Sequence, residues 1–159
     1  MKTCLKVIAC MAALAFLMLV QSASAQGKLE GVWKITHVTL TGPNAQTITN
    51  PQPGFMIFTK KYSSLVGITG DKPQPDLPQN ATDAQKLATW NPLAATVGTY
   101  EIKGTTVTRH NIVAKNGVKR GSFGTADFKI EGNTLTMTFK ANQDGPIANP
   151  TTITLVRME

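Results

Sequence analysis

The feature that most constrains the fold is a series of short runs in which apolar side chains alternate with threonine or charged side chains. In the clearest run, residues 134–141, Leu135, Met137 and Phe139 fall on one face, and threonines and Lys140 fall on the other. Successive side chains of a β-strand point to opposite faces, so this period of two predicts strands with one buried face. Threonine supports the same assignment, because β-branched side chains suit a half-buried pleated surface. The sequence therefore predicts an all-β protein.

Eight runs of this kind are expected, at about residues 29–40, 54–59, 62–69, 96–103, 105–115, 118–130, 134–141 and 151–158. Most connections are short, and Asn116-Gly117 has the residue types that a two-residue hairpin turn requires. Gly67 predicts a bulge or a bend within the third run, and segments 41–53 and 142–150 are expected to be loops. A closed barrel hides all strand edges, so we expect an eight-stranded antiparallel up-and-down barrel. An open β-sandwich is the alternative, because periodicity alone does not separate the two folds.

A long segment, residues 70–95, interrupts the alternating pattern. Its first part is rich in proline, and Thr82 to Gln85 then has the spacing of a capping box. A short helix is therefore expected to about Trp90, where Asn91-Pro92 ends it. Such a helix in a long loop would either cover one mouth of the barrel or act as a lid over its entrance.

Residues 1–25 have the pattern of a secretory signal peptide. Lys2 and Lys6 flank the start of an apolar run, residues 7–20, that is too short for a stable membrane span, and Ala23-Ser24-Ala25 provides a cleavage site. A lipoprotein signal is the alternative, but Cys10 lies inside the apolar run, so cleavage there would leave almost no apolar run before the cysteine and an apolar stub after it. The remaining residues, 26–159, are expected to form one barrel domain that is periplasmic or secreted in a bacterium.

Composition excludes several classes of function. Cys4 and Cys10 both lie in the signal segment, so the mature chain has no thiol for a disulfide, a nucleophile or a metal site. Removal of the two signal lysines lowers the formal net charge from +7 to +5, and the basic residues are scattered, which argues against a nucleic-acid partner. With two histidines and no metal-binding motif, neither a metal nor another cofactor is expected.

The chain resembles the bacterial lipocalin-like domain family, part of the wider calycin group. The resemblance spans most of the mature chain and is carried by residues 29–34 (Leu-Glu-Gly-Val-Trp-Lys), 54–59, 98–102 and 107–110 and by Arg157. It implies an eight-stranded antiparallel barrel with a central cavity that binds small apolar or amphipathic molecules. It also implies that Gly31 and Trp33 close one end of the barrel, with Arg157 across the indole face. A guanidinium over an indole stabilises by about 0.5–2 kcal/mol and can also bond strand carbonyls, which supports this pairing on physical grounds.

Strand parity selects the side chains expected to face a ligand. His37 shares parity with Trp33 and Ile35, and Tyr100 shares parity with Ile102. The local pattern does not decide whether Arg109 or His110 points inward. Phe55, Ile57, Met137 and Phe139 are equally well explained as filled core. An inward histidine such as His37 is more often a hydrogen-bonded core or cavity residue than a catalytic base, and Tyr100 is more often a wall-packing aromatic than a ligand donor. The full set of candidate ligand-binding residues is His37, Ile35, Phe55, Ile57, Tyr100, Arg109, His110, Met137 and Phe139.

Three functions are compatible with these residues. The first is the binding of a small-molecule ligand, which we favour because no catalytic constellation is recognisable. The second is a barrel isomerase, cyclase or hydrolase, which requires at least two of the cavity histidines, Arg109 and Tyr100 to share one pocket. The third is an interaction module of the envelope that uses loops 41–53 and 70–92. An exposed apolar patch would be the sign, formed by Leu77, Leu87, Trp90 and Leu93.

Overall fold

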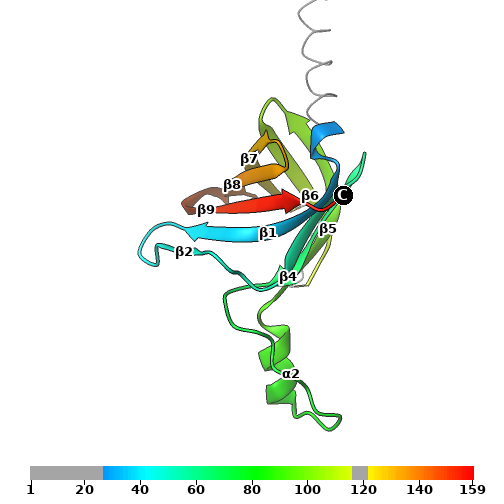
Figure 1. The fold of residues 1–159 in the computed structure, drawn as a ribbon, viewed down its shortest axis with the longest axis vertical. Helices are drawn as coiled ribbons and strands as arrows, with labels where there is room; N and C mark the ends of the chain where they lie inside the picture. The colour runs from blue at the N-terminus through cyan, green and yellow to red at the C-terminus, as the bar shows by residue number, and fades with distance from the viewer. Residues whose placement is uncertain (1–26, 116–121) are drawn as a thin grey trace, which may run out of the picture.

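The computed structural model describes residues 27–115 and 122–159. The signal peptide predicted for residues 1–25 and the turn predicted at Asn116-Gly117 lie outside the described residues. The fold is all-β, an eight-stranded antiparallel up-and-down barrel with one short helix (Figure 1). This architecture is compatible with the calycin fold, as the resemblance implied.

The described elements follow one another along the chain with few crossings. Helix α2 (Asp83–Trp90) lies between the fourth and fifth strands. Adjacent barrel strands pair antiparallel in chain order, and the short strand β2 is an addition that pairs only with the far half of β1. The strands are β1 (Gly31–Leu40), β2 (Gln46–Ile48), β3 (Gly54–Phe58), β4 (Tyr62–Ile68), β5 (Leu93–Lys103), β6 (Thr106–Ala114), β7 (Phe123–Glu131), β8 (Thr134–Asn142) and β9 (Gly145–Arg157).

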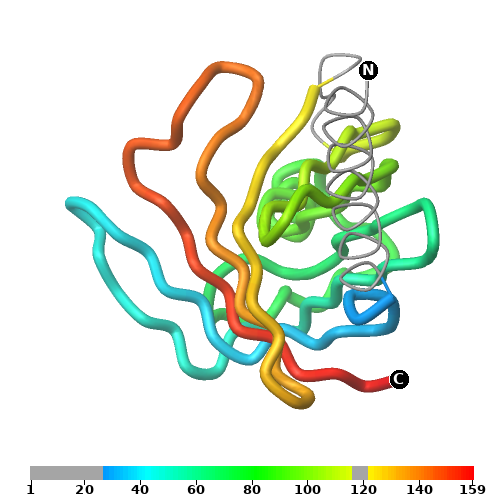
Figure 2. Tube along the Cα trace, turned by 90° about the horizontal axis from the view of Figure 1, so that it is seen from above, coloured from blue at the N-terminus to red at the C-terminus, as the bar shows by residue number. Residues whose placement is uncertain are grey.

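The barrel closes where β9 returns to β1. Their antiparallel ladder runs from the pair Trp33 and Arg157 to the pair Leu40 and Thr151. Figure 2 shows the two strands beside each other, with the C-terminus near the first described residues. This pairing excludes the open β-sandwich, because the first and last barrel strands belong to one continuous sheet.

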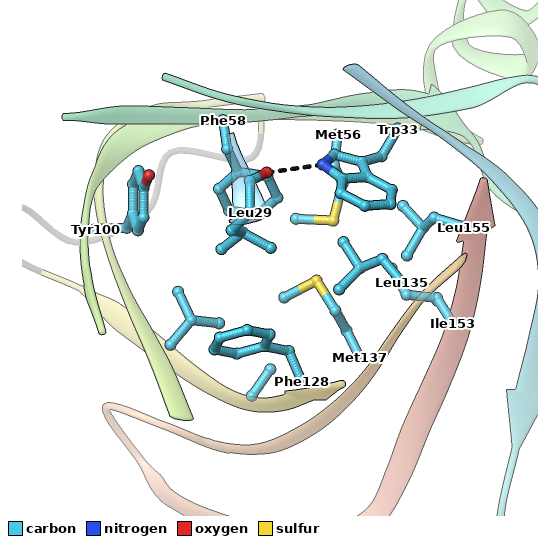
Figure 3. Packing of buried hydrophobic residues seen from close by; sticks show 12 residues of the cluster. Leu29, Trp33, Met56, Phe58, Tyr100, Phe128, Leu135, Met137, Ile153 and Leu155 are labelled. Carbon is cyan, nitrogen blue, oxygen red and sulfur yellow. Dashed lines mark hydrogen bonds between the residues drawn. The ribbon is translucent and has the colours of Figure 1, made fainter. Parts of the chain in front are cut away.

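One end of the barrel is filled with apolar side chains. Trp33, Met56 and Leu135 are fully buried there, and Leu29 enters from the segment that precedes β1 (Figure 3). The short turns at residues 59–61, 104–105 and 132–133 all lie at this closed end. The connections at residues 41–45, 69–92 and 143–144 lie at the opposite, open end. The core therefore occupies only one half of the interior.

The predicted contact between the two chain ends is present at the closed end. The Cζ atom of Arg157 lies 4.1 Å from the centroid of the Trp33 ring, and the Trp33 Nε1–H donates to the carbonyl of Leu29 at 2.8 Å. Arg157 also donates from Nη1 to the carbonyl of Glu30 at 2.6 Å and from Nη2 to that of Lys28. The guanidinium thus joins β9 to the indole and to the segment before β1.

Gly31 has a specific role in this closure. Its φ is +133°, a conformation that residues with a Cβ rarely adopt. A Cβ atom built on Gly31 would lie 2.5 Å from the carbonyl oxygen of Glu159 and 2.6 Å from Nη1 of Arg157. A glycine is therefore required here both by the backbone and by the close approach of the guanidinium.

The last strand is longer than the sequence predicted. It begins at Gly145, which pairs with Asn142 in a tight hairpin. In the additional part, Pro146 lies opposite Ala141 of β8, and Pro150 lies where the β8–β9 register is interrupted. Neither proline pairs with β1, because the β1–β9 ladder ends at Thr151. Proline cannot donate a backbone hydrogen bond, so it is tolerated where one edge of a strand is unpaired. The loop predicted over this stretch is therefore a strand.

Of the bulge or bend predicted at Gly67, the bulge is absent. The β3–β4 register is unbroken, and Gly67 lies opposite Gly54. A Cβ atom on Gly67 would lie 2.7 Å from the Cα of Gly54, so the glycine allows a close approach of two backbones. Bulges or irregularities occur elsewhere, including one in β1 between Ile35 and His37.

Helix α2 forms as predicted but covers neither mouth of the barrel. Thr82 is its N-cap, and the reciprocal bonds between Thr82 and Gln85 complete the predicted capping box. None of its residues is buried, and the helix projects away from the barrel (Figure 1). The expectation that it covers a mouth or closes over an entrance is therefore wrong for this structure.

The Trp33–Arg157 contact predicts a measurable coupling. Trp33→Ala should lower the free energy of unfolding by about 3–5 kcal/mol, and Arg157→Ala by about 1–3 kcal/mol. The double variant should lose about 0.5–2 kcal/mol less than the sum, because each single change already removes their mutual contact. Urea unfolding followed by fluorescence and circular dichroism measures the cycle. Strictly additive losses would contradict an energetic contact between the two side chains.

Candidate ligand site in the open half of the barrel

The open half of the barrel contains a first cavity of about 340 Å³ between β1, β2 and β4. It lies where the strand paired with β1 changes. β1 pairs with β3 only as far as Lys34 and with β2 only from Val38. Pro51 lies in the connection between β2 and β3, where a residue without an N–H cannot extend the ladder. Much of its lining is apolar and includes Ile35, Val38, Leu40, Ile48, Leu65 and Ile68.

A second cavity, of about 430 Å³, lies beside the first between the open ends of β5 to β9. The two cavities share Leu65 and Thr151 in their linings, which makes them neighbours across these two side chains. The second cavity is more polar in character, with Arg109, Asn111, Asn142 and Gln143 among its lining residues beside Phe123, Phe139 and Ile147.

Arg109 is the principal buried charge of the site. Its side chain points into the barrel from β6, and the residue is only 8% exposed. Its Nε–H donates to the hydroxyl of Ser63 at 3.1 Å, and its Nη2 donates to the hydroxyl of Thr96 at 2.9 Å. Within residues 27–115 and 122–159, no carboxylate forms an ion pair with Arg109.

Burial lowers the pKa of the Arg109 guanidinium well below its ordinary value, to about 10. Desolvation is the cause, because a low-dielectric environment disfavours the charged form. The group nevertheless stays protonated at neutral pH, three units below that value. The site therefore holds a full positive charge whose partners in the described chain are neutral hydroxyls, an arrangement that costs free energy until an anion approaches.

Both histidines lie outside the barrel, which corrects the prediction that His37 faces the cavity. The irregularity in β1 places His37 opposite Thr154 and Val38 opposite Ile153, so that Val38 takes the inward position. On β6, Arg109 points inward and His110 outward, where its Nε2 lies 3.5 Å from a carboxylate oxygen of Glu101. Neither histidine lines either cavity.

Phe55 and Ile57 were also assigned to the wrong face. They are 37% and 41% exposed, whereas their neighbours Met56 and Phe58 are buried. The run Gly54–Phe58 is apolar at nearly every position, so it carries no period from which a face can be read. The pairing of Met56 with the inward Trp33 decides the parity of β3, and only the assembled sheet provides that pairing.

The remaining candidates face inward, but some belong to the filled half of the barrel and others line the cavities of the open half. Tyr100 and Met137 belong to the filled core, and the Tyr100 hydroxyl donates to the carbonyl of Thr59 at 2.6 Å. Ile35 lines the first cavity and Phe139 the second. Whether these side chains bind a ligand stays a prediction.

Several lining residues escaped the sequence analysis, among them Leu65, Thr96 and Asn111. Asn111 shares strand parity with Arg109, so an inward assignment of the arginine would have identified it. Leu65 and Thr96 come from neighbouring strands, and their proximity to Arg109 depends on the pairing of β4 with β5. No local signal in the sequence marks them.

No family model, no curated protein and no solved structure matches this chain. Among the described residues, no helix is both long enough and apolar enough to span a membrane. The same residues contain no group of three or more histidine, cysteine, aspartate or glutamate side chains arranged to hold a metal ion.

The unpaired charge of Arg109 predicts that its removal does not destabilise the protein. The Ser63→Ala and Arg109→Met double variant replaces both partners of a buried bond with apolar groups, and it should be about 1–3 kcal/mol more stable at pH 7. Because burial lowers the pKa of Arg109, the charged guanidinium destabilises the folded state. This destabilisation is complete below about pH 10 and falls as pH rises through that value. Urea unfolding at pH 7 and pH 10.5 measures both effects. A double variant less stable than the wild type would show that Arg109 serves the fold.

Proposed function

We propose that this protein binds a small apolar or amphipathic molecule in the open half of its barrel. The observation that carries the proposal is the division of the interior into a filled half and a hollow half with two adjoining cavities of about 340 and 430 Å³. Cavities of about 300–1,000 Å³ with apolar walls and a few polar groups are typical of small-molecule sites. Interiors otherwise pack densely, as the closed end of this barrel does.

The proposal extends to the family and to the place of action. The closed eight-stranded barrel and the Trp33–Arg157 contact support membership of the bacterial lipocalin-like domain family. The lysines, apolar run and small-residue cleavage pattern of residues 1–25 support export of the domain to the periplasm or the medium. Edman sequencing of the protein purified from cells and growth medium tests export, and a mature protein that begins at Met1 would contradict it.

Two adjacent alanines of β5 offer a matched test of ligand binding. Ala94 lines the first cavity, whereas Ala95 faces an outer groove beside Trp90 and Val97. We expect N-phenyl-1-naphthylamine, a neutral fluorescent amphiphile, to bind the wild type with a micromolar Kd. Ala94→Phe should weaken binding at least tenfold by filling the cavity, and Ala95→Phe should leave it within twofold.

Fluorescence titration measures these affinities, and displacement by dodecan-1-ol confirms that the probe occupies a site open to aliphatic chains. The thermal midpoint of each variant checks that both still fold, since overpacking can cost about 1–3 kcal/mol. Probe binding that is abolished by Ala95→Phe and unaffected by Ala94→Phe would place the ligand on the outside of the barrel and refute the proposal.

A second candidate function, contact with another protein of the envelope, is favoured by the excursion that carries α2. Three members of the apolar patch expected of an interaction module, Leu77, Leu87 and Trp90, are exposed there, whereas the fourth, Leu93, is partly buried. None of them lines the two cavities of the open half. Leu77→Ser with Leu87→Ser should therefore leave the affinity for N-phenyl-1-naphthylamine unchanged in the same titration. A severalfold loss of affinity would instead assign the excursion to the ligand site.

A further inference from the structure

We infer that the ligand carries a single anionic head group, of which a carboxylate is the simplest example, and that Arg109 binds it in the second cavity. The apolar part of the same molecule then extends past Leu65 and Thr151 into the first cavity. This inference rests on the proposed function, because it specifies the chemical class of the molecule that the open half accepts.

The hydrogen bonds of Arg109 leave donors available for such a head group. A guanidinium has five N–H donors, and the two bonds to Ser63 and Thr96 use one on Nε and one on Nη2. The other three N–H groups, two of them on Nη1, have no partner among the described residues. Arg109 lines the second cavity, so this cavity is the space open to these donors.

The geometry of the remaining donors suits an oxyanion. Nη1 and Nη2 present parallel N–H groups at the end of the planar guanidinium, an arrangement that binds the two oxygens of a carboxylate together. The hydroxyls of Ser63 and Thr96 hold the other side of the group, so its orientation is set before a ligand arrives. Binding therefore requires little reorganisation of the side chain.

The charge of the surroundings selects an anion. Among the described residues that line the two cavities, Arg109 is the only charged side chain, and the lining contains no aspartate or glutamate. The other polar groups near the head-group position are neutral, such as Asn111 and Asn142. A cationic head group would add a second uncompensated charge, whereas a monoanion would neutralise the one already present.

The first cavity provides the place for the tail. Its lining has no charged residue and is formed largely by branched aliphatic side chains. Leu65 and Thr151 belong to both linings, so the two cavities adjoin at these residues, and we place the unbranched chain across them. The combination of one buried cation and one adjoining apolar cavity fits an amphiphile with an anionic end.

The test compares three probes of equal chain length: dodecanoate, dodecan-1-ol and dodecyltrimethylammonium. Each displaces N-phenyl-1-naphthylamine from the wild-type protein at pH 7.5, below the concentration at which the probes form micelles. We expect dodecanoate to bind at least tenfold more tightly than dodecan-1-ol and dodecyltrimethylammonium to bind most weakly. Equal affinity for dodecanoate and dodecan-1-ol would overturn the head-group inference and leave the proposed function intact. Failure of all three to bind would count against the proposed function itself.

Variants then test the assignment to Arg109. Arg109→Gln should weaken dodecanoate binding at least tenfold and thereby abolish its preference over dodecan-1-ol. Lys129→Gln, which removes an exposed cation of β7, is the matched control and should retain the preference. If Arg109→Gln does not fold, the Ser63→Ala and Arg109→Met double variant replaces it in the same comparison. A preference for dodecanoate that survives the loss of Arg109 would show that the head group binds elsewhere.

Discussion

The ladder between β1 and β9 is the interaction on which the rest of this structure depends. It converts a meander of strands into a closed barrel, and the Trp33–Arg157 contact lies at the first pair of that ladder. Arg157 also bonds the carbonyls of Lys28 and Glu30, and Trp33 bonds that of Leu29, so the segment before β1 is held against the base of the core. One guanidinium thereby joins the closure of the sheet to the closure of one barrel end.

Firm packing at that end allows the other end to remain hollow. The fully buried side chains, including Met56, Leu135 and Leu155, provide apolar burial that does not depend on the open half. The interior changes from filled to hollow along β6, where Val107 belongs to the core and Arg109 lines a cavity. An uncompensated charge is tolerable at this level because the core below it supplies the stability. The cost is compatible with a binding group, since an anionic ligand would offset it.

Strand parity was a good guide where the alternation was clean and failed where it was interrupted. It identified Ile35, Met137 and Phe139 as inward-facing. It misplaced His37, because an irregularity in β1 changes which residues pair with β9, and a bulge is a property of two strands together. It had no basis for a choice in the apolar run of β3, whose faces are assigned only by the partner strand.

The order of the barrel strands and the capped helix α2 followed from the sequence by itself, because alternation, turn residues and caps act over a few neighbouring positions. The meeting of Trp33 with Arg157 was implied by the resemblance to the lipocalin-like family. Only the tertiary structure decided that the interior is filled at one end and hollow at the other. It also decided that Arg109 faces the open half and forms no ion pair with a carboxylate of the described residues. Cavities and the burial of a charge depend on side chains from strands far apart in the chain, and their packing becomes defined only when the barrel closes.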